Sequence, residues 1–152
     1  MIIFILATVI ILISALVYAG YASTSLPSDK DLQGAKSTLV WIETVGWISV
    51  IIIILIAIFL AEELATTGIG YLFALALISM LGFVGWLCAS ATTAISNSVE
   101  YRKSTNRNDD VQKAYGYAYL ATELSLGSII FLIVVTIAYY MGRESVKIRR
   151  RY

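Results

Sequence analysis

Two acidic residues inside long apolar stretches are the side chains in this sequence best placed to do chemistry. They are Glu43 and Glu123, and aromatic residues lie close to both. An ionisable group inside a bilayer is costly, so it commonly marks a proton or cation pathway. The aromatic neighbours are Trp41 and Trp47 around Glu43, and Tyr115 and Tyr119 before Glu123.

The same residues fit a second interpretation, in which both carboxyl groups lie at the headgroup level. Tyrosine and tryptophan gather at the membrane–water interface in aromatic belts. The stretch Leu124–Met141 holds 18 residues, which nearly suffices to cross a bilayer without Glu123. We favour this membrane-interface position, and it predicts that Glu123→Gln leaves folding and assembly nearly intact.

Enzymatic and metal chemistry has little support in the sequence. There is no histidine, and Cys88 is the one cysteine, without a CxxC partner. A transition-metal site would have to combine carboxylates with this single thiol, which is a poor ligand set. We recognise no nucleophile paired with a base. We therefore expect no enzyme, and no catalytic, cofactor-binding or metal-ligating residues.

Small residues that permit close helix packing form a further candidate group. Helices associate in lipid through close contact, because lipid tails are as apolar as leucine. Small side chains recur at four-residue spacing in two of the apolar stretches. The predicted helix-packing residues are Ala15 and Ala19 in the first stretch, and Gly82, Gly85, Ala89 and Thr93 in the third. We expect these faces to contact other helices, within the chain or in a partner.

Hydroxyl groups cluster at the end of the third apolar stretch, where they admit two interpretations. They are Ser90, Thr92, Thr93, Ser96 and Ser98. Such groups line polar paths in some membrane proteins, but more often they donate hydrogen bonds to carbonyl groups of their own helix. We favour the second interpretation.

The carboxyl-terminal tail is strongly basic. Its cationic residues are Lys147, Arg149, Arg150 and Arg151. A cluster of this kind next to a membrane binds anionic lipid or an acidic partner surface. It also anchors the topology of the chain by the positive-inside rule, and the two roles are compatible.

The elements that carry these residues are four long apolar stretches, at residues 2–22, 39–61, 69–95 and 114–141. A helix rises ~1.5 Å per residue, so about 20 residues cross a hydrocarbon core of ~30 Å. Hydrophobic residues make up 59% of the chain and charged residues 14%, against about 45–50% and about 25% in soluble domains. The predicted fold class is therefore all-α, a single integral membrane domain with four transmembrane helices.

Helices two and four are predicted to extend beyond the bilayer. Pro27 ends the first helix, and the second starts near Asp29, before its apolar part. Gly68 is the expected helix stop before the third stretch. A polar loop at residues 100–113 precedes the fourth helix, for which Asn108 is the expected N-cap. That helix is predicted to continue into the basic tail at residues 143–152.

Four spans place both termini on the same side of the membrane. The loops on one side hold Lys30, Lys36, Arg102, Lys103, Arg107 and Lys113, and the other side holds Arg143, Lys147, Arg149, Arg150 and Arg151. These charges nearly balance under the positive-inside rule. The dense cluster at Arg149–Arg151 favours cytoplasmic termini.

These features favour a structural or accessory subunit of a larger membrane assembly, either a membrane complex or a membrane-containing virus particle. Such a subunit acts through helix packing and protruding helix ends, with lipid and other membrane or membrane-apposed proteins as partners. The alternative is a small oligomeric channel or proton-coupled transporter that uses Glu123 or Glu43. A net charge of +1 gives no field that would attract nucleic acid.

Overall fold

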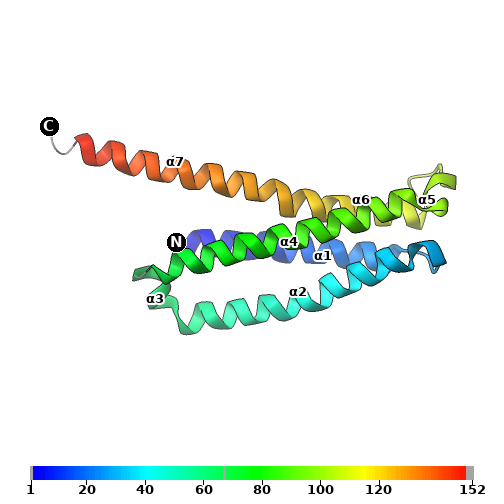
Figure 1. The fold of residues 1–152 in the computed structure, drawn as a ribbon, viewed down its shortest axis with the longest axis horizontal. Coiled ribbons are helices and arrows are strands. Elements are labelled where there is room, and N and C mark those ends of the chain that lie inside the picture. The colour runs from blue at the N-terminus through cyan, green and yellow to red at the C-terminus, as the bar shows by residue number, and fades with distance from the viewer. Residues whose placement is uncertain (1, 67, 150–152) are drawn as a thin grey trace.

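The chain folds into a bundle of long helices in a computed structural model that describes residues 2–66 and 68–149 (Figure 1). Nearly all of these residues are helical, and they form no strand. In chain order the elements are α1 (Ile2–Ser25), the 3-10 helix η1 (Lys30–Leu32), α2 (Gln33–Phe59), α3 (Ala61–Thr66), α4 (Ile69–Asn97), α5 (Val99–Lys103), α6 (Asp110–Thr122), the π-helix η2 (Glu123–Gly127) and α7 (Ser128–Arg149).

Four helical stretches are long and apolar enough to cross a membrane. They are Ile3–Ser25, Lys30–Phe59, Ile69–Asn97 and Asp110–Ala138. The prediction of an all-α membrane protein with four transmembrane helices is thereby confirmed. The protein is therefore a multi-pass integral membrane protein, and its apolar helices contact the lipid bilayer.

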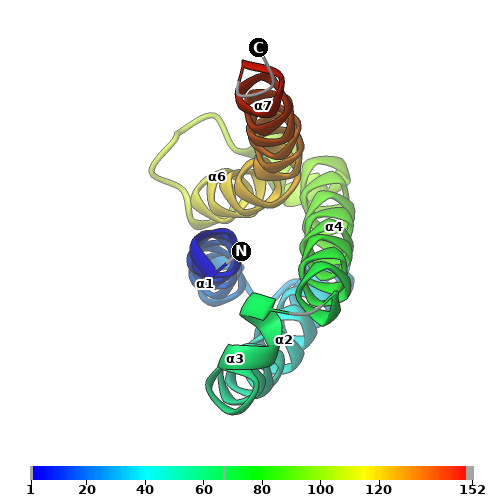
Figure 2. The same cartoon turned by 90° about the vertical axis from the view of Figure 1, so that its left-hand side faces the viewer.

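The helices α1, α2, α4 and α6 form the four sides of the bundle. The helix α1 packs against α2 and α6, and α4 packs against the same two helices from the opposite side. The end-on view in Figure 2 shows this arrangement. Neighbours run antiparallel, so that the start of α1, the turn through α3 and the end of α7 lie at one end of the molecule, and the polar loop beside α5 lies at the other (Figure 1).

The fourth membrane helix is continuous from Asp110 to Arg149, as predicted, but it contains a π-helical segment at which it bends. Between α6 and α7 the five residues Glu123–Gly127 form a π-helix, a local widening that bends helices. The helix α7 then leaves the four-sided bundle, as Figures 1 and 2 show. Of the α7 side chains that the structure describes, Leu132 is the last that is buried.

Two predicted helix boundaries lie close to those in the structure. The N-cap of α6 is Asp109, one residue after the expected Asn108, and the Asn108 amide N–H instead donates to Asn106 Oδ1 at 3.0 Å. Gly68 lies between α3, which ends at Thr66, and α4, which begins at Ile69, so the predicted helix stop coincides with a helix break. Its φ of −63° is right-handed, so the break does not use the left-handed conformation that favours glycine.

Candidate functional site

Glu43 is half-buried on α2 and faces a notch on α1. The notch is made by Gly20, where an added Cβ would lie 3.0 Å from Glu43 Oε1. The buried Ser23 hydroxyl lies 3.5 Å from Glu43 Oε2 and donates a shorter bond of 2.9 Å to the Gly20 carbonyl oxygen. Glu43 therefore contributes to the contact between α1 and α2, with a hydroxyl group as its polar neighbour.

Glu123 occupies a different environment. It is the first residue of the π-helix η2, and its side chain is exposed. Its polar partner is the hydroxyl group of Tyr119, one turn earlier on α6. Glu43 has its polar neighbours on α1, whereas Glu123 has its polar neighbour on the same membrane helix as itself. Among the described residues, the two carboxyl groups therefore do not share one site. No cluster of three potential metal ligands occurs in the described part of the chain either.

Aromatic side chains on α2, α4 and α6 lie near the level of Glu43 and Glu123 along the bundle. Trp41 packs edge-on against Phe83 of α4, with ring centroids 6.3 Å apart, and Phe83 contacts Trp86 at 6.1 Å. Tyr115 contacts Tyr119 at 6.2 Å along α6. Trp47 is half-buried and packs against the core.

A tyrosine cluster between α1 and α6 is absent from the sequence-based prediction. Tyr117 stacks on Tyr18 with centroids 6.2 Å apart and tilts against Tyr21 at 5.5 Å. Tyr18 and Tyr21 are spaced to share a helix face, which is a signal in the sequence. Their partner on α6 becomes evident only once α1 and α6 are placed side by side.

The predicted small residues differ in where they lie. Ala15 and Ala19 are fully buried. Gly85 is buried against the π-helix: an added Cβ would lie 2.7 Å from Leu126 Cγ and 3.0 Å from Ser125 Cβ. The remaining members of the predicted face are less enclosed, with Gly82 and Ala89 half-buried and Thr93 exposed.

Gly46 is a close-packing glycine that the sequence analysis missed. A Cβ at this position would overlap both methyl groups of Leu16, which is fully buried on α1. No other small residue lies four positions before or after Gly46, because those positions hold Ile42 and Val50. The pattern that identifies a small-residue face is therefore missing.

Four of the five hydroxyl groups predicted to donate back to α4 do so: Thr92, Thr93, Ser96 and Ser98. The bonds run from Thr92 to the Cys88 carbonyl at 2.7 Å, from Thr93 to Ala89 at 3.0 Å, from Ser96 to Thr93 at 2.8 Å and from Ser98 to Ile95 at 2.7 Å. Ser98 also accepts from the Tyr101 amide at 3.2 Å, which caps α5.

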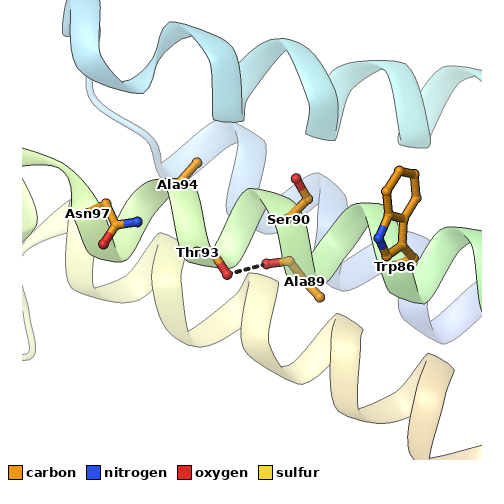
Figure 3. Close-up of a pocket in the computed structure, with 6 residues that line it drawn as sticks. All are labelled: Trp86, Ala89, Ser90, Thr93, Ala94 and Asn97. Atoms are coloured by element: carbon orange, nitrogen blue, oxygen red, sulfur yellow. Dashed lines mark hydrogen bonds between the residues drawn. The ribbon is translucent and has the colours of Figure 1, made fainter.

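The outer face of α4 carries a shallow hollow near the polar loop. Figure 3 shows the side chains that line it, all from α4: Trp86, Ala89, Ser90, Thr93, Ala94 and Asn97. All of these except the half-buried Ala89 are exposed. The hollow is open and is lined by one helix, so it lacks the enclosure typical of a small-molecule site.

The described residues include little of the basic tail. The side chains of Lys147 and Arg149, and the whole of Arg150 and Arg151, fall outside the described residues. The proposal that this tail contacts lipid or a partner therefore rests on its sequence.

No protein-family model, curated protein or solved structure matches this chain.

Proposed function

We propose that the protein is a structural or accessory subunit of a larger membrane assembly, such as a membrane complex or a membrane-containing virus particle. The observation that carries the proposal is the departure of α7 from the bundle. Beyond Leu132 no described side chain of α7 is buried, and Val134, Ile137 and Met141 are 54–67% exposed. A helix that stands apart offers both flanks to neighbouring membrane proteins.

The contacts of the polar side chains support the same proposal. The Glu43 carboxyl group lies in an α1–α2 contact, and the α4 hydroxyl groups bond to their own helix. Polar groups used in this way hold a scaffold together and provide no path for solutes. The basic tail, with cytoplasmic termini, would add a contact to anionic lipid or to an acidic surface of a partner.

A channel or proton-coupled transporter is the second candidate, and one observation favours it. Glu43 is half-buried in the bundle, and no lysine or arginine occurs in the sequence between Lys36 and Arg102. A membrane carboxyl group without a cationic neighbour in its own helix is a feature of proton pathways.

Copurification and flux measurements separate the two proposals. A tagged chain is extracted from its native membrane in mild detergent, and bound proteins are quantified against the chain. Recovery of unrelated proteins at fixed stoichiometry supports the subunit. A pure homo-oligomer that carries protons or cations in liposomes, and loses the flux on Glu43→Gln or Glu123→Gln, supports the channel and refutes the subunit proposal.

A further inference from the structure

We infer that the bilayer surrounds only the half of the molecule that contains α3 and α7, and that the other half of the bundle stands in water. The boundary lies at the level of Glu43, Trp86 and Glu123. The inference goes beyond the proposed function, because it holds equally for a subunit and for a channel. It follows from the register between neighbouring helices, from the exposed side chains and from helix lengths.

The register between α1 and α2 is fixed by two glycines. Glu43 of α2 faces Gly20 of α1, and one turn further along α2 Gly46 faces Leu16. The two helices run antiparallel, so the level of Glu43 on α1 is close to Gly20.

The registers of α4 with its two neighbours extend this level around the bundle. On the α2 side, Val45 and Val84 lie at the centre of a hollow shared by the two helices. Glu43 lies two residues before Val45, and Trp86 lies two residues after Val84. Both steps lead toward the polar loop, so Glu43 and Trp86 lie at the same level of the bundle. On the fourth helix, Gly85 faces Ser125 and Leu126, so Glu123 lies within about one helical turn of Trp86 along the bundle axis.

The helix lengths on the α3 side of this level match a bilayer. The segments are residues 2–19, 43–60, 69–86 and 124–141, each of 18 residues, which corresponds to ~27 Å of helix. The hydrocarbon core of a bilayer is ~30 Å thick. On the loop side, α4 continues from residue 87 to 97, which adds ~16 Å. The whole of α4 therefore exceeds the membrane thickness, and the excess lies at one end.

Exposed apolar side chains are concentrated on the proposed membrane half. Ile51 is 57% exposed, Leu72 69% and Ile130 68%. Beyond the boundary, the large hydrophobic residues that the structure describes as exposed are Tyr21, Val40, Trp41, Val99, Tyr119 and Leu120. Several of these are aromatic residues with a polar group, and such residues prefer the headgroup level.

The loop-side half has the inside–outside pattern of a water-exposed bundle. Its buried residues come from α1, α2, α4 and α6 and include Ala22, Leu39, Cys88, Ile95, Ala114 and Ala118. Its exposed residues include Gln33, Ser37, Ser90, Asn97 and Lys113. Apolar residues inside and polar residues outside are typical of helices that face water. The hollow in Figure 3 then opens to solvent, with Trp86 at its membrane edge.

Two serines on the same face of α4 give a matched test. Ser79 and Ser90 are both exposed, and a separation of three helical turns keeps them on one side of the helix. Ser79 lies ~10 Å from Trp86 toward the membrane, and Ser90 lies ~6 Å from it toward the loop. Cys88 is the one native cysteine, so Cys88→Ala provides a background without thiols.

The experiment compares Ser79→Cys, Ser90→Cys and Asn97→Cys in lipid nanodiscs, with a charged maleimide as the probe. Thiolates react and thiols in lipid do not ionise, so we expect Ser90→Cys and Asn97→Cys to label at least about tenfold faster than Ser79→Cys. Equal labelling of all three variants after unfolding in SDS, and equal helicity by circular dichroism in nanodiscs, are the controls.

Two outcomes would overturn the inference. If Ser90→Cys is as slow as Ser79→Cys while Asn97→Cys reacts, the membrane covers nearly all of α4. If Ser79→Cys reacts as fast as Ser90→Cys, water reaches the proposed membrane half.

Tryptophan quenching gives a second measurement that needs no cysteine. In the variant Trp41→Phe/Trp47→Phe, Trp86 is the one remaining tryptophan. Lipids brominated near the headgroup should quench it more strongly than lipids brominated near the chain ends. The reverse order would place Trp86 near the bilayer centre and contradict the inferred boundary.

Discussion

Substitution of Gly46 by alanine tests the packing of α1 against α2 directly. The new Cβ would collide with the methyl groups of Leu16 and lie 3.2 Å from its Cγ, and Leu16 is fully buried. Overpacking of a well-packed interior costs about 1–3 kcal/mol. The helix gains about 0.5–1 kcal/mol from replacement of glycine by alanine. We therefore expect Gly46→Ala to lower the free energy of unfolding by up to about 2.5 kcal/mol.

Reversible unfolding in mixed micelles, followed by circular dichroism, measures this difference. The matched control is Gly116→Ala on α6, where an added Cβ has nothing within 4 Å, so this variant should be neutral or slightly more stable. In the background of Leu16→Ala the collision is removed, and Gly46→Ala should no longer destabilise. The coupling free energy of this double-mutant cycle should be about 1–3 kcal/mol. Equal stability of Gly46→Ala and Gly116→Ala would refute the close approach of the two helices.

The remaining predictions concern the polar residues. Glu43→Gln should retain the fold, because the amide oxygen can still accept a hydrogen bond from Ser23. Gly20→Val should destabilise the α1–α2 contact, because the new side chain would approach the Glu43 carboxyl group. Unfolding in micelles compares the stabilities of the two variants, and equal stabilities would contradict the notch at Gly20. Glu123→Gln should leave assembly size unchanged by size-exclusion chromatography, since its side chain is exposed; dissociation of the assembly would show that its charge is needed. Ser98→Ala removes the side-chain cap of α5 and should lower the free energy of unfolding by about 0.5–2 kcal/mol. Amide hydrogen exchange at Tyr101 should become faster, and unchanged exchange would show that the Ser98 hydroxyl group does not cap the helix.

The membrane fold was predictable because its signal is local. Uninterrupted apolar residues such as those around Ile53 determine a spanning helix without knowledge of its neighbours. The close contact at Gly85 was also indicated by sequence, because small residues recur one turn apart. In each case the periodicity of a single helix carries the information.

Other features depend on tertiary contacts and could not be read from one helix at a time. Gly46 has no small residue four positions before or after it, so its contact with Leu16 is evident only in the packed bundle. The π-helix that begins at Glu123 adds one residue to a helical turn, and hydrophobic periodicity barely changes over such a short segment. The bend at this π-helix directs α7 away from the bundle, and nothing in the periodicity of the fourth helix predicts it.

Native mass spectrometry of the chain, released from its source membrane in lipid nanodiscs, tests the central claim most directly. The claim is that this membrane protein acts through contacts with other proteins. The predicted result is a complex of defined mass in which the chain and unrelated proteins are present at fixed stoichiometry. A spectrum that contains only copies of this chain, with or without bound lipid, would contradict the claim.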